Sequence, residues 1–181
     1  MKNAQGLIER LARGAGPIRA LVEGMGDEEA RWRPSSGGWS ILEVICHLKD
    51  EETDDFRQRL RLTLEDPAKE WPPMDPEGWV TERRYQERSL KPELEGFLAE
   101  RRKSLDWLRG LESPDWSRAH THPQLGSMAA GDLLASWVAH DLLHVRQIAR
   151  IQYEHARVLA APFKPDYAGP VVAVRCQAQV S

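Results

Sequence analysis

The chain has few cysteines, no long apolar run and no excess of charge of one sign. Its 181 residues include two cysteines, Cys46 and Cys176, outside any C-x-x-C pair, so neither a disulfide framework nor a cysteine zinc site is indicated. No segment approaches the apolar length of a membrane span, and the first residues lead into a polar amphipathic segment rather than a signal peptide. A net charge of −3 with the two signs interspersed gives no electrostatic footprint for nucleic acid. We therefore expect a cytoplasmic protein without membrane or nucleic-acid partners, in which Cys46 is a core residue.

The length is sufficient for one substantial core but short for two, so residues 1–181 are predicted to form a single domain, with 155–181 a mostly irregular C-terminal tail. No convincing strand pattern precedes the tail, whereas apolar spacing predicts an all-α, four-helix bundle with long crossover connections. Gly14, Gly16 and Pro17 should kink or break the first helix. The four long helices are expected over Ala4–Glu23, Ile41–Leu64, Pro92–Arg109 and Met128–Tyr153.

The segments between these helices are predicted from their proline content and polarity. Residues 71–76 are expected to be an ordered crossover loop, followed by a shorter helix over Glu77–Arg88. Residues 113–126 form a second connection, in which His120 and His122 should be exposed. Arg101 to Lys103 is interpreted as a solvated helix face. The tail is expected to pack across the bundle or against a partner.

The most informative feature is the pair His140 and His144. Two side chains four residues apart on a helix lie about 40° apart around the axis and roughly 6 Å along it, so both imidazoles can reach one metal ion. Six histidines give this spacing by chance in roughly one such chain in six, so the pair alone is a weak motif. The pair nevertheless belongs to a core-facing stripe, where unpaired imidazoles are costly, so the alternatives are a metal site or two hydrogen-bonded core histidines. The stripe comprises Leu133, Trp137, His140, His144, Ile148 and Ile151.

His47 is the best candidate for a third ligand. Ser40 and Glu43 form an S-x-x-E capping box, which starts a helix at Ile41 and places His47 about two turns into it, on the flank of the apolar face. If this helix and the last one are antiparallel neighbours, the three histidines meet at matching heights, near one end of the bundle. The same flank carries Glu51 and Asp54, which are expected to be solvated charges; the alternative is a carboxylate ligand or a side chain that orients an imidazole.

Together these motifs resemble the DinB/YfiT-like superfamily of bacterial four-helix-bundle proteins. The resemblance extends from about Leu7 to Tyr153 and is carried by Trp32-Arg33-Pro34, by Trp39-Ser40 with the early His47, and by the late segment His-Asp-x-x-His-x-x-Gln-Ile. In that family three histidines bind a divalent metal, usually nickel or zinc, which implicates His47, His140 and His144. Some members are similar to thiol S-transferases that use a low-molecular-weight thiol cosubstrate, and the bundles often form homodimers. The resemblance therefore implies the site more directly than the reaction.

Three neutral imidazoles leave at least one position open on zinc or nickel, as in a catalytic site. Such a metal lowers the pKa of bound water for hydrolysis, or binds a substrate thiol as the attacking thiolate. The resemblance favours a metal-dependent thiol S-transferase acting on a small-molecule substrate. The alternatives are a metal-dependent hydrolase and a noncatalytic stress or interaction protein with the same bundle. The residues themselves leave the reaction and its general acid or base unassigned.

Overall fold

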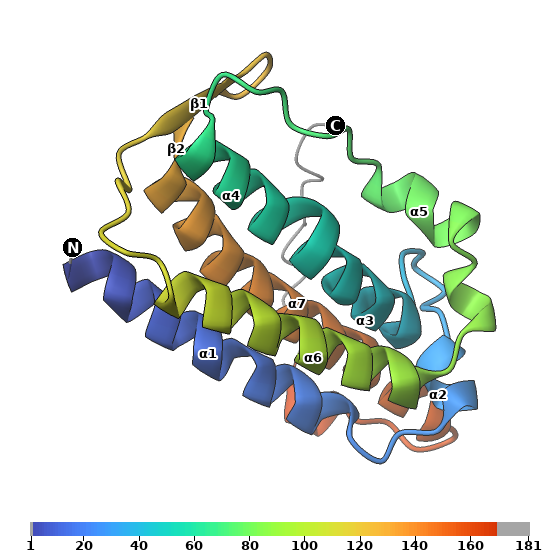
Figure 1. Ribbon diagram of the computed structural model, residues 1–181. Coiled ribbons are helices and arrows are strands. Elements are labelled where there is room, and N and C mark those ends of the chain that lie inside the picture. The colour runs from blue at the N-terminus through green and yellow to red at the C-terminus, as the bar shows by residue number, and fades with distance from the viewer. Residues whose placement is uncertain (1, 170–181) are drawn as a thin grey trace.

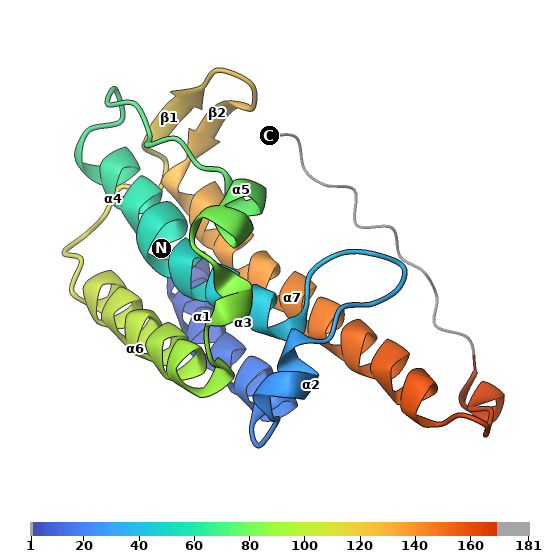
Figure 2. The same cartoon turned by 90° about the vertical axis from the view of Figure 1, so that its right-hand side faces the viewer.

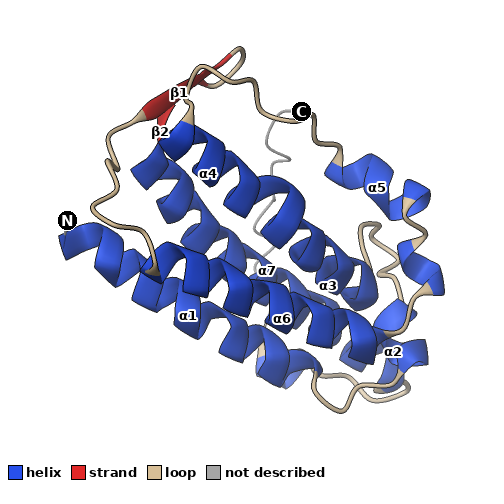
Figure 3. Cartoon of the chain, viewed as in Figure 1, coloured by secondary structure: helices blue, strands red, loops and turns tan. Residues whose placement is uncertain are grey.

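The computed structural model describes residues 2–169 of the chain, which form four long helices and one small hairpin (Figures 1 and 3). The elements, in chain order, are α1 (Lys2–Val22), α2 (Asp27–Arg31), α3 (Ile41–Asp50), η1 (Glu51–Phe56), α4 (Arg57–Glu65), α5 (Pro76–Glu82), η2 (Tyr85–Glu87), α6 (Leu90–Arg109), β1 (Ala119–His122), β2 (Gly126–Ala129), α7 (Ala130–Leu159) and η3 (Asp166–Ala168). Cys176 and the end of the expected tail lie outside the described residues. Within the described part of the chain, no helix is both long and apolar enough to cross a membrane.

The second long helix consists of three consecutive segments, α3, η1 and α4. It begins where the sequence predicts, because Ser40 caps it: the Glu43 amide donates to Ser40 Oγ, and the Ser40 amide donates to Glu43 Oε2. The middle segment η1 is π-helical. π-Helical turns are rare in proteins, and those that occur are frequently found at functional sites.

The helices form a bundle in which neighbours in the sequence are not always antiparallel. Figure 1 shows α1 and α7 running in one direction and the α3–α4 helix and α6 running in the other. The antiparallel neighbours α3 and α7 are the two helices that carry the candidate histidines, as the sequence predicts. Because α4 and α6 are parallel, the segment between them must return along the whole bundle. Residues 66–89, with α5 and η2, form this long crossover connection.

The apolar core is divided into two clusters along the bundle axis. One is centred on residues such as Ile18, Ile45 and Ile148, and the other on residues such as Leu11, Leu60 and Leu134. Between them, each long helix contributes polar groups to a middle layer: the Leu11 carbonyl, Glu51, Glu52, Asp55, Arg101, Ser104, His140, Asp141 and His144. The candidate histidines therefore have an apolar cluster on each side of them along the axis, and the expectation of a site near one end of the bundle is wrong.

Arg101 is the centre of this layer and is 2% exposed, which contradicts its interpretation as part of a solvated face. Its guanidinium donates to both carboxylate oxygens of Asp141 at 2.7 and 2.8 Å, to Glu52 Oε1 at 2.7 Å and to the Leu11 carbonyl at 3.0 Å. Glu52 also accepts from Ser104 Oγ. The residue is buried because three elements, α1, η1 and α7, supply its acceptors, which compensates for the loss of solvation.

Two other expectations about the elements need correction. Helix α1 is uninterrupted despite Gly14, Gly16 and Pro17, because tertiary packing outweighs local helix propensity. The connection after α6 contains the antiparallel strands β1 and β2, although no strand was expected there. This hairpin buries His120, whose ring stacks on Trp71.

The last helix, α7, extends to Leu159, beyond its expected end near Tyr153, and Figure 2 shows it projecting past the other helices. In the described part of the following segment, residues 160–169, Phe163 is 80% exposed and Tyr167 is fully exposed, so these two aromatic side chains do not pack across the bundle.

Candidate metal centre

The imidazoles of His47, His140 and His144 converge from two helices. His140 Nε2 lies 3.4 Å from His47 Nε2 and 3.0 Å from His144 Nε2, and the candidate ligand atoms all lie within 4.8 Å of one another. The spacing of four places His140 and His144 on successive turns of α7, while α3 presents His47 from the opposite side. The structure thus brings together all three histidines that the sequence predicts.

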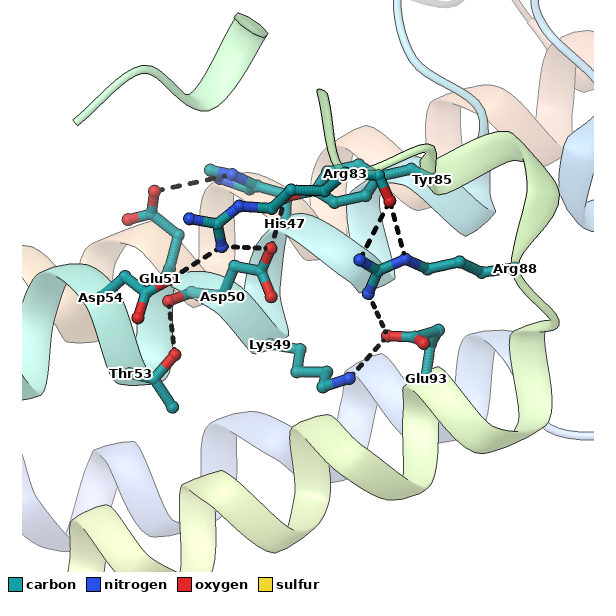
Figure 4. Close-up of polar contacts among 10 residues, drawn as sticks. All are labelled: His47, Lys49, Asp50, Glu51, Thr53, Asp54, Arg83, Tyr85, Arg88 and Glu93. Atoms are coloured by element: carbon teal, nitrogen blue, oxygen red, sulfur yellow. Dashed lines mark hydrogen bonds and ion pairs between the residues drawn. The ribbon is translucent and has the colours of Figure 1, made fainter. Parts of the chain in front are cut away.

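The other ring nitrogens of two of these histidines face acceptor oxygens. His144 Nδ1 lies 2.7 Å from Gln147 Oε1, one turn further along α7. His47 Nδ1 lies 3.5 Å from Glu51 Oε1, and Figure 4 shows Glu51 reaching toward the ring from the following turn. A proton on each Nδ1 leaves the Nε2 lone pair free, so these contacts favour the tautomer in which Nε2 binds a metal.

The three imidazoles are neutral at physiological pH. Burial lowers the pKa of His144 to about 4. Burial, reinforced by the charge of His144, holds the pKa of His47 well below its usual value, and the same two causes act on His140. Neutral imidazole is the form that binds a metal, so the electrostatics of the site leave its lone pairs available.

The donor set fits zinc or nickel. With Zn–N bonds of about 2.0–2.1 Å, tetrahedral geometry separates two ligand nitrogens by about 3.3 Å. The two Nε2 separations of 3.0 and 3.4 Å are close to this value. Where the Nε2 atoms carry no proton, their convergent lone pairs repel one another, which a bound cation would relieve. His47, His140 and His144 would therefore hold the metal and leave a further coordination position open.

Aromatic rings flank the site on two sides. The ring of Trp39 lies 4.8 Å from that of His47, and the ring of Phe56 lies 5.1 Å from that of His140. His47 and His144 are 4% and 8% exposed, whereas His140 is only partly buried. Among the three histidines, His140 is thus the one that is not fully buried, and the ring of Phe56 adjoins it.

A second polar network secures the crossover connection against α3. Figure 4 shows the buried Asp50 accepting hydrogen bonds from Tyr85 and Arg83, both at 2.7 Å. Arg83 also contacts Asp54 at 2.7 Å, which places Asp54 in this network and away from the imidazoles. The network fixes η2 beside the turn of α3 that carries His47.

Sequence reasoning underestimated the charged groups behind His47. Glu51, expected to be solvated, is 3% exposed, and Asp55, for which the sequence makes no prediction, is 6% exposed. The missed signal is the four-residue spacing that continues from His47 through Glu51 and Asp55 to Arg59. His120 and His122 do not join the three histidines among the described residues, although His120 is buried rather than exposed.

A bundle with a buried three-histidine cluster defines the class of this protein as a candidate metalloprotein. A family model described as the DinB superfamily matches residues 10–148, and the chain therefore belongs to this superfamily. It is also 27% identical, over 137 residues, to a protein of Oceanobacillus iheyensis named "Putative metal-dependent hydrolase"; the match covers 74% of this chain and 77% of the relative.

The fold is similar to that of YfiT from Bacillus subtilis, described as "a probable metal-dependent hydrolase with an unusual four-helix bundle topology". The TM-score is 0.76 at 20% identity, with 86% of this chain and 89% of YfiT covered. This similarity confirms the predicted four-helix bundle.

Proposed function

We propose that the chain is a metal-dependent enzyme in which His47, His140 and His144 bind one divalent cation, zinc or nickel. The observation that carries this proposal is the convergence of three Nε2 atoms at 3.0 and 3.4 Å spacings. Gln147 and Glu51 support it, because their oxygens face the opposite nitrogens of His144 and His47. A metal held by three neutral imidazoles keeps its full charge and lowers the pKa of a water or thiol in its open position.

Hydrolysis is the reaction that we propose first. It is supported by the descriptions of the two relatives, both of which refer to a metal-dependent hydrolase. The residues of this chain would orient the substrate: Trp39 and Phe56 offer apolar rings beside the imidazoles, which suits a small molecule with an apolar group next to its reacting bond.

Thiol transfer is the second candidate, and the donor set suits it as well as it suits hydrolysis. The three proposed ligands carry no negative charge, so a substrate thiol placed in the open position readily loses its proton. Cys46 is not the nucleophile, because it is buried in the core and burial raises the pKa of its thiol to about 12. The thiol would come from a low-molecular-weight cosubstrate.

Metal analysis of the purified protein tests the site. We expect one zinc or nickel ion per chain in the wild type, and at least a hundredfold weaker binding in His140→Ala. His122→Ala is the control, because this residue lies on the hairpin and not in the cluster. Wild-type protein that binds neither ion, or unchanged affinity in His140→Ala, contradicts the proposal.

Paired assays then separate the two reactions. The loaded protein is incubated with activated esters and amides in one arm, and with an electrophile and a small thiol in the other. Each arm is repeated with a chelator and with His140→Ala. Chelator-sensitive ester or amide cleavage supports hydrolysis, and chelator-sensitive conjugation supports thiol transfer.

A homodimer is the assembly expected from the family resemblance, and it stays a prediction. Light scattering of the purified protein tests it, and a monomer at micromolar concentration contradicts it.

A further inference from the structure

Four residues of the second long helix form a row behind the candidate metal centre: His47, Glu51, Asp55 and Arg59, each four residues from the next. The row is buried for most of its length, with exposures of 4% for His47, 3% for Glu51 and 6% for Asp55. Arg59 ends it with a side chain that is 14% exposed. Four ionisable groups in one buried row are costly unless each satisfies its neighbour.

The contacts follow the order of the row. His47 Nδ1 lies 3.5 Å from Glu51 Oε1, the carboxyl group of Asp55 is close enough to interact with that of Glu51, and Asp55 Oδ1 pairs with Arg59 Nε at 2.8 Å. Arg59 is itself anchored to the crossover connection, since it donates to the Pro72 carbonyl and lies 5.0 Å from the centre of the Trp71 ring. The row thus links the candidate ligand to a fixed cation.

The π-helical segment η1 keeps the row on one face. In an α-helix each step of four residues rotates the side chain by about 40°, so three such steps would carry Arg59 well around the helix. A π-helical turn contains more residues than an α-helical turn, so a step of four residues through η1 does not add the full rotation. Glu51 and Asp55, the two inner members of the row, both lie in η1 and are buried.

The row places a cation at the end far from the candidate metal ligand. Glu51 and Asp55 are adjacent buried carboxyl groups, and the Arg59 guanidinium pairs with Asp55. Glu51 Oε1 is the acceptor that faces His47 Nδ1, and no other hydrogen-bond partner reaches either atom among the described residues. A donor at position 51 that points toward Asp55 would complete the contacts of the row.

We propose that Glu51, held by Asp55 and Arg59, is a positioning residue that keeps the proton of His47 on Nδ1 and turns its Nε2 toward His140 and His144. This inference rests on the proposed function, because Glu51 would position His47 for metal binding. Its geometric claim, the tautomer and orientation of His47, is a property of the metal-free chain and can be measured there.

Glu51→Gln and Glu51→Met form the critical pair of variants. Glutamine supplies the same oxygen acceptor to His47 and an N–H donor to Asp55, so it keeps a contact to each neighbour. Methionine fills similar space with neither group. Nitrogen-15 NMR of the metal-free protein should show the Nδ1–H tautomer of His47 in the wild type and in Glu51→Gln, and a mixture of tautomers in Glu51→Met.

Zinc and nickel affinities, measured by chelator competition, give a second readout. We expect Glu51→Met to bind about 10- to 100-fold more weakly than the wild type, and Glu51→Gln to remain within about threefold. Asp55→Leu should cause a smaller loss, because Glu51 still reaches His47 but lacks its own partner.

Glu52→Met is the matched control. Glu52 is the adjacent residue and equally buried, but its carboxylate contacts Arg101, Ser104 and Trp137 rather than His47. It should lower thermal stability without changing the His47 tautomer or the metal affinity.

The outcomes separate this inference from the proposed function. Wild-type protein that binds neither zinc nor nickel overturns the proposed metal site, while the tautomer measurement still decides the role of Glu51. Metal binding in the wild type with equal affinity in Glu51→Met overturns the positioning role alone. An Nε2–H tautomer of His47 in the wild type also overturns the positioning role. This measurement uses the wild-type protein alone, so it does not depend on whether a variant folds.

Discussion

Gly14 of α1 lies directly against the carboxylate of Asp141 on α7. A Cβ atom at position 14 would come within 2.1 Å of Asp141 Oδ2. This oxygen cannot move away cheaply, because Arg101 binds both oxygens of the carboxylate in the polar middle layer. The absence of a side chain at Gly14 therefore allows α1 to close over a buried ion pair.

Gly14→Ala should destabilise the protein by about 1–3 kcal/mol, because the added methyl group displaces a carboxylate that is held at both oxygens. Gly16→Ala is the control on the same helix, since nothing lies within 4 Å of its Cβ position. It should stabilise by about 0.5–1 kcal/mol through helix propensity. Urea unfolding followed by circular dichroism measures both, and equal effects of the two substitutions would contradict the close approach.

Arg101→Met should destabilise by about 3–5 kcal/mol, because it leaves Asp141 and Glu52 buried without their cation. Arg102→Met, at an exposed position on the same helix, should change the free energy of unfolding by less than about 0.5 kcal/mol. Denaturant midpoints of the two variants provide the comparison. A loss below about 1 kcal/mol in Arg101→Met would show that the buried network contributes little.

Acidification should destabilise the metal-free protein through its buried histidines. The pKa of His144 falls from 6.5 to about 4 on folding, so the unfolded chain binds more protons between these values and stability decreases as the pH falls through this window. Relative to His144→Gln, the wild type should lose about 3 kcal/mol of stability between pH 7 and pH 4. The comparison cancels the carboxyl groups common to both proteins. A constant difference across this range would contradict the depressed pKa.

Zinc should raise the thermal stability of the wild type, because only the folded chain brings the three imidazoles together. At a free concentration of one hundred times the dissociation constant the gain is about 2.7 kcal/mol. Differential scanning fluorimetry should show this shift in the wild type and in His122→Ala. The same shift in His47→Ala would locate zinc elsewhere on the chain.

The sequence predicted the features that depend on local pattern. The Ser40 capping box located the start of α3, the four-residue spacing paired His140 with His144, and apolar periodicity gave the four long helices. The same capping box placed His47 about two turns into its helix as the best candidate for the third member, and the resemblance to a known family implies the same residue. The structure shows the three histidines together, and their binding of a metal remains the proposal to be tested.

The failures concern groups whose burial depends on distant partners. The sequence of its own helix predicts that Arg101 is exposed. Its burial depends on acceptors that come from α1, η1 and α7. Local sequence likewise predicts a solvated charge at Glu51, whereas in the structure its carboxyl group lies between His47 and Asp55. Strands β1 and β2 are too short to show an alternating pattern. Such features require knowledge of which segments meet, which a single sequence does not provide.

The division of the core by a polar middle layer has a consequence for how the helices align along the bundle axis. Apolar side chains tolerate sliding, but a shift of one helical turn, about 5.4 Å, would move Arg101 from its carboxylates onto leucine and isoleucine. We therefore expect the polar layer to permit only one axial alignment of the helices and to disfavour alignments shifted by a turn. The ion pair of Arg101 with Asp141, the residue next to His140, would then fix the axial position of α7 relative to α6.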